Sequence, residues 1–383
     1  MQRTAAHEGE RDIHDEPPQA PPGTAPSRAV EVGTAAAVPP LVSFAVRFYN
    51  CEAFVEAALA SAFAQSYSPL EIIVADDHSS DRTFALAERV VAAYRGPHRV
   101  QLFRNQRNLG TGGQMEEIRR RMAGDILVIA DGDDISLPTR SERVCAALSA
   151  GGPSLMGLDC RFALIDESGR PLAAEAMAAA GVGPAGERLS AGEIARGRAG
   201  PQGAVSAYRR AVLEAGTSLA ALRHSEDRVL ALRAMLLGRL VTIPEVLVLR
   251  RVHGGNVSGA ISTSWSGRQL RAWFSEDVRR RIPVAATMRR DVAALAAEGR
   301  IEAALVPHLL GDIAAYRREA KLLRVAARLG PLGVWSVYLA LRRLGVPAKE
   351  AIRALLTQTA PSLAMVFLKR NPLFRARARA SRR

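Results

Sequence analysis

Between residues 41 and 130 the chain alternates short apolar runs with amphipathic stretches. Four runs have the length of strands buried on both faces: Leu41–Val46, Glu71–Ala75, Arg99–Phe103 and Asp125–Ala130. Three intervening stretches carry apolar residues at helical spacing, roughly over 52–65, 81–94 and 113–122. This order predicts an α/β fold with a doubly wound, mainly parallel, Rossmann-like sheet and helices on both faces.

The pattern is looser after residue 150. Residues 167–203 are rich in Gly, Ala and Pro and are predicted to form loops over a ligand site. A helix is expected at about 224–237, a strand over Leu240–Val252, and mostly helical, increasingly basic sequence over 266–383. We therefore divide the chain into a disordered leader (1–40), a sheet domain (41–260) and a helical, basic C-terminal region (261–383).

Composition adds one unusual feature to this picture, which is the charge. Hydrophobic residues make up 48% and charged residues 23% of the 383 residues, as in ordinary globular proteins. The formal net charge of +14, however, indicates an anionic partner such as nucleic acid, acidic lipid or a phosphorylated substrate. Three widely spaced cysteines favour a reducing compartment, and we expect neither a signal peptide nor a membrane-spanning helix.

An acidic run, Asp131, Asp133 and Asp134 around Gly132, follows the fourth apolar run. Like charges this close cost stability unless a cation or hydrogen-bond donors compensate them. Because alternate residues of an extended chain point to one side, Asp131 and Asp133 are expected to face the same way. Carboxylates suit a hard divalent cation, so we predict a metal site bridging a diphosphate. The alternative is a plain turn that caps the following helix.

Polar pairs also follow the first two predicted strands, where an α/β sheet binds its ligands. Tyr49 and Asn50 follow the first strand, and Asp76 and Asp77 follow the second. The carboxylate of Asp76 could accept from a base N–H or a ribose hydroxyl. Ser80 or Asp81, by contrast, is predicted to cap the next helix.

Three further segments carry weaker signals. The glycine-rich stretch beginning with Asn108 and Gly110 could approach phosphates with bare backbone, but a loop or a helix entry explains it equally well. Glu226 and Asp227 open a predicted helix, where acidic residues usually complement the helix dipole. A lone histidine such as His253 is more often a satisfied polar residue than a ligand.

Taken in order, these segments resemble the family 2 glycosyltransferases, an inverting group with a GT-A fold. The resemblance covers about residues 41–258 and rests on five segments: VSFAVRFYN, EIIVADDHSSDRT, NLG with AGDILVIADGDD, HSEDRVLALR and RRVHGGNVS. It implies transfer of a sugar from a nucleotide-diphosphate sugar, UDP-linked by expectation, to an acceptor hydroxyl. Polysaccharide or glycoconjugate biosynthesis is the implied setting.

The resemblance also implies roles for matching positions. Tyr49 and Asp76 would hold the base, within a donor site that includes Asn50, Asp77, Asn108 and Gly110. Asp131 would meet the ribose or the metal, and Asp133 would bind Mn²⁺ or Mg²⁺. Asp227, beside Glu226, would be the general base. His253 matches a position that completes the metal or diphosphate site in some relatives. Asp134 is the least defined of the three acids and is expected only to cap the turn that follows.

Two positions depart from the family pattern. The family usually has proline before its Tyr-Asn pair, where this chain has Arg47-Phe48. An Arg-Asn pair is common in the helix after Asn108, and the aligned residues here are Met115 and Glu116. Both departures lie in the nucleotide-binding half and therefore bear on donor-site detail.

The basic C-terminal region has two open interpretations. Its apolar stretches beside Arg-rich sequence suit an anionic membrane surface, whereas the alternative is a solvated helical appendage with a disordered tail. Its aromatic residues are not regularly interleaved with its charges, so we expect no nucleic-acid partner. The expected partners are a nucleotide-sugar donor and a saccharide or lipid-linked acceptor, at a cytoplasmic location at the inner face of the plasma membrane.

Two other functions remain as alternatives. A nucleotidyltransferase has a similar sheet and a glycine-rich loop, and a non-catalytic membrane- or polymer-binding protein could retain the scaffold. The Glu226-Asp227 pair and the Arg251–His253 segment count against the first alternative. The acids at positions 76, 131, 133 and 227 count against the second.

Overall fold

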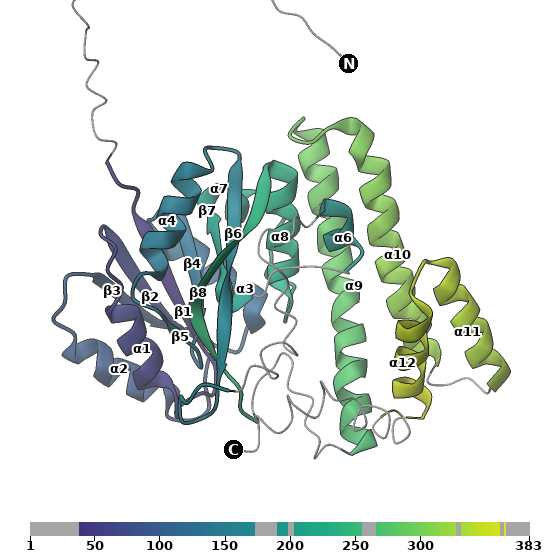
Figure 1. Ribbon diagram of the computed structural model, residues 1–383, viewed down its shortest axis with the longest axis horizontal. Coiled ribbons are helices and arrows are strands. Elements are labelled where there is room, and N and C mark those ends of the chain that lie inside the picture. The colour runs from purple at the N-terminus through teal and green to yellow at the C-terminus, as the bar shows by residue number, and fades with distance from the viewer. Residues whose placement is uncertain are drawn as a thin grey trace, which may run out of the picture. The chain divides into compact units, whose positions relative to one another are not determined.

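A computed structural model describes residues 38–172, 190–197, 203–254, 266–326, 331–360 and 364. The predicted leader lies almost entirely outside these residues. Of the described residues, those from Pro39 onward form one compact unit. Within it, an eight-stranded sheet has the order β3-β2-β1-β4-β7-β6-β8-β5 (Figure 1).

The first half of the sheet is parallel, as predicted. Its strands are β1 (Val42–Phe48), β2 (Leu70–Asp76), β3 (Arg99–Arg104) and β4 (Ile126–Asp131). The connecting helices are α1 (Val55–Phe63), α2 (Thr83–Ala93) and α3 (Gly110–Arg121). Parallel neighbours joined by helices place the carboxyl ends of β1, β2 and β4 at one edge.

The second half of the sheet is mixed. Its strands are β5 (Ile135–Ser136), β6 (Leu155–Ile165), β7 (Ser206–Arg209) and β8 (Arg239–Arg251). Strand β7 runs antiparallel to both β4 and β6, whereas β6 and β8 are parallel to each other. The fold is therefore a mixed, mainly parallel α/β sheet of GT-A type, and the predicted fold class is confirmed.

The alternation of side chains along β1 explains why helices cover both faces of the sheet. Phe44 packs in a core with Leu59 of α1 and with α4 (Arg140–Ala150). Ala45 points the other way, into a core shared with α3 and α8 (Glu226–Leu237). Successive residues of a strand face opposite sides, so two helical layers are required to bury this strand.

The C-terminal helices are α9 (Gly267–Ala297), α10 (Val306–Ala326), α11 (Pro331–Arg343) and α12 (Ala348–Thr359). Met288 of α9 and Ile313 of α10 lie in the same core as Leu230 of α8. The predicted helical extension is thus present and shares a core with the helices that cover the sheet (Figure 1). Among the described residues, no helix has the length and hydrophobicity needed to cross a membrane.

Several elements differ from expectation or were not predicted. The helix expected at 113–122 begins at Gly110, so the glycine-rich stretch forms its first turn. Strands β6 and β7 and helix α4 were not predicted. The region expected to form loops contains the short helices α6 (Ala191–Ala195) and η1 (Gly203–Val205), and 173–189 and 198–202 lie outside the described residues.

Candidate active site at the carboxyl edge of the sheet

The strand register brings the sequence-predicted acids to one edge. Asp131 at the end of β4 is the register partner of Arg47 on β1, and Asp76 at the end of β2 is the partner of Phe48. The side chains therefore converge because neighbouring parallel strands end at the same level. This edge is where α/β sheets bind their ligands.

The acidic run forms a turn. The backbone N–H of Asp134 donates to the carbonyl of Asp131 at 3.2 Å, and Gly132 N–H donates to the carbonyl of Arg47 at 2.8 Å. A Cβ atom at position 132 would overlap the ring of Phe48, so the turn requires glycine there. The expectation of an extended segment was wrong, because the backbone reverses immediately after Asp131. The turn nevertheless brings one oxygen of each carboxylate within 4.8 Å of the others.

The three carboxylates have different surroundings. The side chain of Asp131 is 36% exposed and that of Asp133 is 22% exposed. Asp134 is buried, and its Oδ1 accepts the N–H of Arg251 at 2.8 Å. Burial, and then the charge of Asp133, raise the pKa of Asp134 well above its ordinary value.

These surroundings fit a divalent cation held mainly by Asp131 and Asp133. Hard cations take carboxylate oxygens, and both groups are accessible. Asp134 instead anchors the end of β8 through the N–H of Arg251. His253 Nε2 lies 3.0 Å from Oδ2 of Asp133, and the His253 ring packs against Phe54 with centroids 4.7 Å apart. His253 is therefore next to the acidic run, as an orienting partner of Asp133.

Arg47 lies between the acidic run and the predicted base. It is buried; its Nε donates to Oδ1 of Asp131 at 3.0 Å, and its Nη1 pairs with Glu226. Burial alone would lower the pKa of Arg47, but the charges of Asp131 and Glu226 raise it above its usual value. The Thr111 hydroxyl also donates to Glu226. In the sequence, Arg47 stood out only as a departure from the family pattern before Tyr49, yet in the structure it joins β4 to α8.

Asp227 lies beside this ion pair at the start of α8. Its half-buried carboxylate accepts the N–H of Arg228 at 2.8 Å. Burial, followed by the charge of Glu226, raises the pKa of Asp227 to about 6. A Cβ atom on Gly203 would lie 3.6 Å from Cβ of Asp227 and 3.2 Å from Nη2 of Arg47, so the chain before β7 passes close to both. Glu226 thus pairs with Arg47 and Thr111, in addition to lying in the first turn of α8, where an acid complements the helix dipole.

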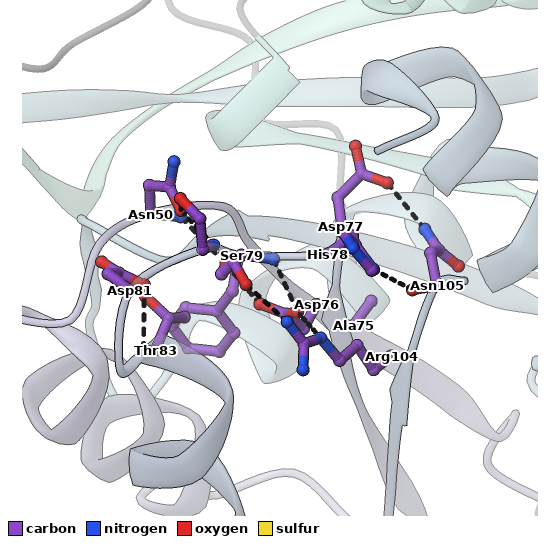
Figure 2. Close-up of polar contacts among 12 residues, drawn as sticks. Asn50, Ala75, Asp76, Asp77, His78, Ser79, Asp81, Thr83, Arg104 and Asn105 are labelled. Atoms are coloured by element: carbon purple, nitrogen blue, oxygen red, sulfur yellow. Dashed lines mark hydrogen bonds and ion pairs between the residues drawn. The ribbon is translucent and has the colours of Figure 1, made fainter. Parts of the chain in front are cut away.

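Asp76 and Asp77 form two adjoining networks at the end of β2 (Figure 2). Asp76 is fully buried; it accepts from the N–H and hydroxyl of Ser79 and lies 3.3 Å from Nε of Arg104. Asp77 accepts from Asn105 and from the N–H groups of Leu109 and Gly110, each at 2.8 Å.

Through these bonds Asp77 fixes the entry to α3. Gly110 has φ of +75°, and a Cβ atom there would collide with the backbone of Arg223. The guanidinium of Arg223 in turn donates to the carbonyl of Asn108 at 2.9 Å and to its Oδ1 at 2.6 Å. Asn108 and Gly110 therefore connect α3 with the segment leading to α8.

Tyr49 and Asn50, the polar pair after β1, have different surroundings. Tyr49 is 50% exposed, whereas Asn50, at φ of 49°, accepts the N–H of Ser80 at 2.8 Å through its Oδ1. Helix α2 begins at Thr83, whose N–H donates to Asp81 at 3.0 Å. Asp81 thus supports the first turn of the helix from one position before its N-cap residue, Arg82.

Comparison with known proteins finds a family that matches part of the chain. Residues 43–216 match the family described as Glycosyl transferase family 2. This segment of the chain belongs to glycosyltransferase family 2, and the predicted membership is confirmed.

The chain is similar to parts of several other proteins. A Bacillus subtilis protein described as a glycosyltransferase, EpsE, is 34% identical over 109 residues, which are 28% of this chain and 38% of EpsE. The Escherichia coli protein WfgD, named UDP-Glc:alpha-D-GlcNAc-diphosphoundecaprenol beta-1,3-glucosyltransferase, is 28% identical over 30% of this chain and 44% of its own length. The chain thus aligns with less than half of each relative. The structure of S. aureus TarS 1-349 in complex with UDP-GlcNAc has 18% identity and a TM-score of 0.46, over 82% of this chain and 90% of TarS 1-349.

Proposed function

We propose that this protein is an inverting, metal-dependent glycosyltransferase that moves a sugar from a nucleotide-diphosphate sugar to an acceptor hydroxyl. The observation that carries the proposal is the arrangement at the sheet edge. Arg47 joins Asp131, next to the accessible Asp133, to Glu226, next to the half-buried Asp227. Two acidic sites with different tasks are thereby held on one rigid scaffold.

In this proposal Asp131 and Asp133 hold Mn²⁺ or Mg²⁺. The cation would neutralise charge on the departing nucleoside diphosphate. His253 orients Asp133 through its contact with Oδ2. Asp134 stays in the protein interior and holds Arg251, which keeps the turn in place.

Asp227 is the proposed general base. It takes the proton of the acceptor hydroxyl as that oxygen bonds to the anomeric carbon and the bond to the diphosphate breaks. A single displacement from the opposite side inverts the anomeric configuration. A base with a pKa of about 6 is ionised at neutral pH yet basic enough to accept a proton.

For the nucleotide we propose that the exposed ring of Tyr49 contacts the base. Asp76 shapes the base pocket through its bonds to Ser79 and Arg104, with Asn50 closing the same loop. Asp77, Asn108 and Gly110 support the pocket by fixing the entry to α3. UDP is the proposed carrier, and the UDP-glucose named as the donor of WfgD supports that choice.

The acceptor is proposed to be a saccharide or a lipid-linked sugar in polysaccharide or glycoconjugate assembly. WfgD is named for a diphosphoundecaprenol-linked acceptor. The division into a catalytic domain (41–260) and a basic helical region (261–383) stays a proposal, as does attraction of that region to an anionic membrane at the cytoplasmic face. Its most basic residues, Lys369–Arg383, lie outside the described residues.

Donor binding tests this function. We expect a matching nucleotide sugar with Mn²⁺ to raise Tm, because a ligand at 100 times its Kd stabilises the folded state by about 2.7 kcal/mol. Asp133→Asn should lose the metal-dependent part of this shift. Asp125→Asn, an exposed acid just before β4, is the matched control and should keep it. An unchanged metal-dependent shift in Asp133→Asn would remove Asp133 from the metal site.

A further inference from the structure

A cavity of about 600 Å³ lies among the helices that follow the sheet. It is lined by residues of α10, by Arg196 at the end of α6, and by Arg343, Leu344 and Gly345 at the end of α11. Its volume is that of a small-molecule site. None of the acids assigned to the donor site or to proton transfer lines it.

The lining of this cavity is basic. Arg196, Arg318 and Arg343 contribute three positive charges against the single negative charge of Asp312. Asp312 is already paired with Arg196, at 2.6 Å. Across the part of the chain that the structure describes, no carboxylate lies within ion-pair distance of Arg318 or Arg343. Guanidinium groups bind phosphate oxygens through paired N–H donors, so the two exposed arginines are suited to a phosphorylated ligand.

The cavity wall at Arg196 is held in place by specific bonds. The Nη1 of Arg196 donates to the carbonyl of Leu344 at 3.2 Å, in addition to the bond to Asp312. Gly197, with φ of +73°, then packs so closely on Tyr316 that a Cβ atom would overlap the tyrosine ring. α6 is thereby fixed against α10 and the end of α11.

A second, smaller cavity of about 50 Å³ lies beside residues that flank the proposed base. Gly197 and Tyr316 line it, together with Ser225 and Arg228. Ser225 and Arg228 are the residues on either side of the Glu226-Asp227 pair, and Gly197 directly follows Arg196 of the larger cavity. The two cavities are therefore neighbours: Gly197 of the smaller one follows Arg196 of the larger one, and Tyr316 lies on α10 between Ala315 and Arg318 of the larger one.

We propose that the larger cavity is a subsite for a phosphate or diphosphate group of the acceptor. This proposal rests on the proposed function and specifies its acceptor as a phosphorylated sugar. The acceptor hydroxyl reacts beside Asp227 while Arg318 and Arg343 bind the phosphate. The C-terminal helices thus take part in acceptor selection.

Binding of inorganic pyrophosphate to the full-length chain, measured by calorimetry with EDTA to suppress metal-dependent binding, tests the site directly. Arg318→Gln with Arg343→Gln should raise Kd at least about tenfold, because each removes charged hydrogen bonds to phosphate. Arg317→Gln with Arg353→Gln is the matched control, since both arginines are exposed on α10 and α12 but lie outside the cavity. Equal Kd values for the two double variants would overturn the proposal.

Two further measurements distinguish a phosphorylated acceptor from the phosphate of a lipid headgroup. Vesicles of phosphatidylcholine with phosphatidylglycerol should bind both double variants equally; a selective loss confined to vesicles would overturn the proposal in favour of a membrane contact.

With an active donor, the cavity variant should raise KM for sugar 1-diphosphates at least about tenfold but leave KM for methyl glycosides and for the donor unchanged. An unchanged KM for the diphosphates would overturn the acceptor assignment. If no nucleotide sugar binds with Mn²⁺, the proposed function fails, and the pyrophosphate result still decides whether the cavity binds phosphate.

Discussion

Asp227→Asn is expected to lower kcat about 10²–10⁴-fold, the usual contribution of a general base. Asparagine has nearly the same shape and can still accept the N–H of Arg228, so the helix start should persist. Removing the charge also relieves repulsion with Glu226, so Tm should not fall. Donor-induced stabilisation should be retained, which separates lost chemistry from lost binding.

The pH dependence supplies an independent readout of the same residue. Because the pKa of Asp227 is raised to about 6, the ionised base is depleted as the pH falls below that value. The transfer rate of the wild-type protein should therefore fall about tenfold per pH unit on the acid side. Asp227→Asn should lack this limb. Wild-type activity in Asp227→Asn would remove Asp227 as the base.

Arg47→Met is expected to destabilise the protein and to disturb both halves of the site. Removing one partner of a buried ion pair costs about 3–5 kcal/mol, because the remaining charge stays buried. Glu226 is almost fully buried, whereas Asp131 is 36% exposed, so we expect a value near the lower end, measured by urea unfolding. Arg82→Met is the control: its ion pair with Glu52 is exposed, so its loss should change the free energy of unfolding far less.

A double-mutant cycle distinguishes this pairing from general damage. Glu226→Gln combined with Arg47→Met should cost less than the sum of the single changes, because the second change removes the unpaired buried charge. Strict additivity would contradict the proposed coupling. Arg47→Lys keeps the charge but not the fork geometry, and should recover part of the stability.

The sequence predicted best those features that depend on one continuous strand or helix. The apolar runs ending near Asp76 and Asp131 are long and continuous, so the parallel strands and the acidic edge were predictable. β6 was missed because Gly157, Asp159 and Arg161 interrupt its apolar pattern. The turn at Asp131 was only the alternative interpretation, because its geometry depends on Gly132 packing over Phe48, a contact that the local sequence does not reveal.

The role of Arg47 could not be read from a local pattern. Its contacts require the register between β1 and β4 and a helix start 179 residues away. In sequence, the residue is only a charged position at the end of an apolar strand. The same applies to Asp77, whose carboxylate is used to fix the entry of α3, a bond that depends on how β2 and α3 pack.

Product analysis tests the central claim most directly. The wild-type protein is incubated with a panel of nucleotide sugars, candidate acceptors and Mn²⁺, and the released nucleotide is identified. The account predicts that one donor yields nucleoside diphosphate, that release requires the metal, and that the new bond has the inverted anomeric configuration. Release of pyrophosphate from a nucleoside triphosphate, with no nucleoside diphosphate from any donor, would contradict it and indicate a nucleotidyltransferase.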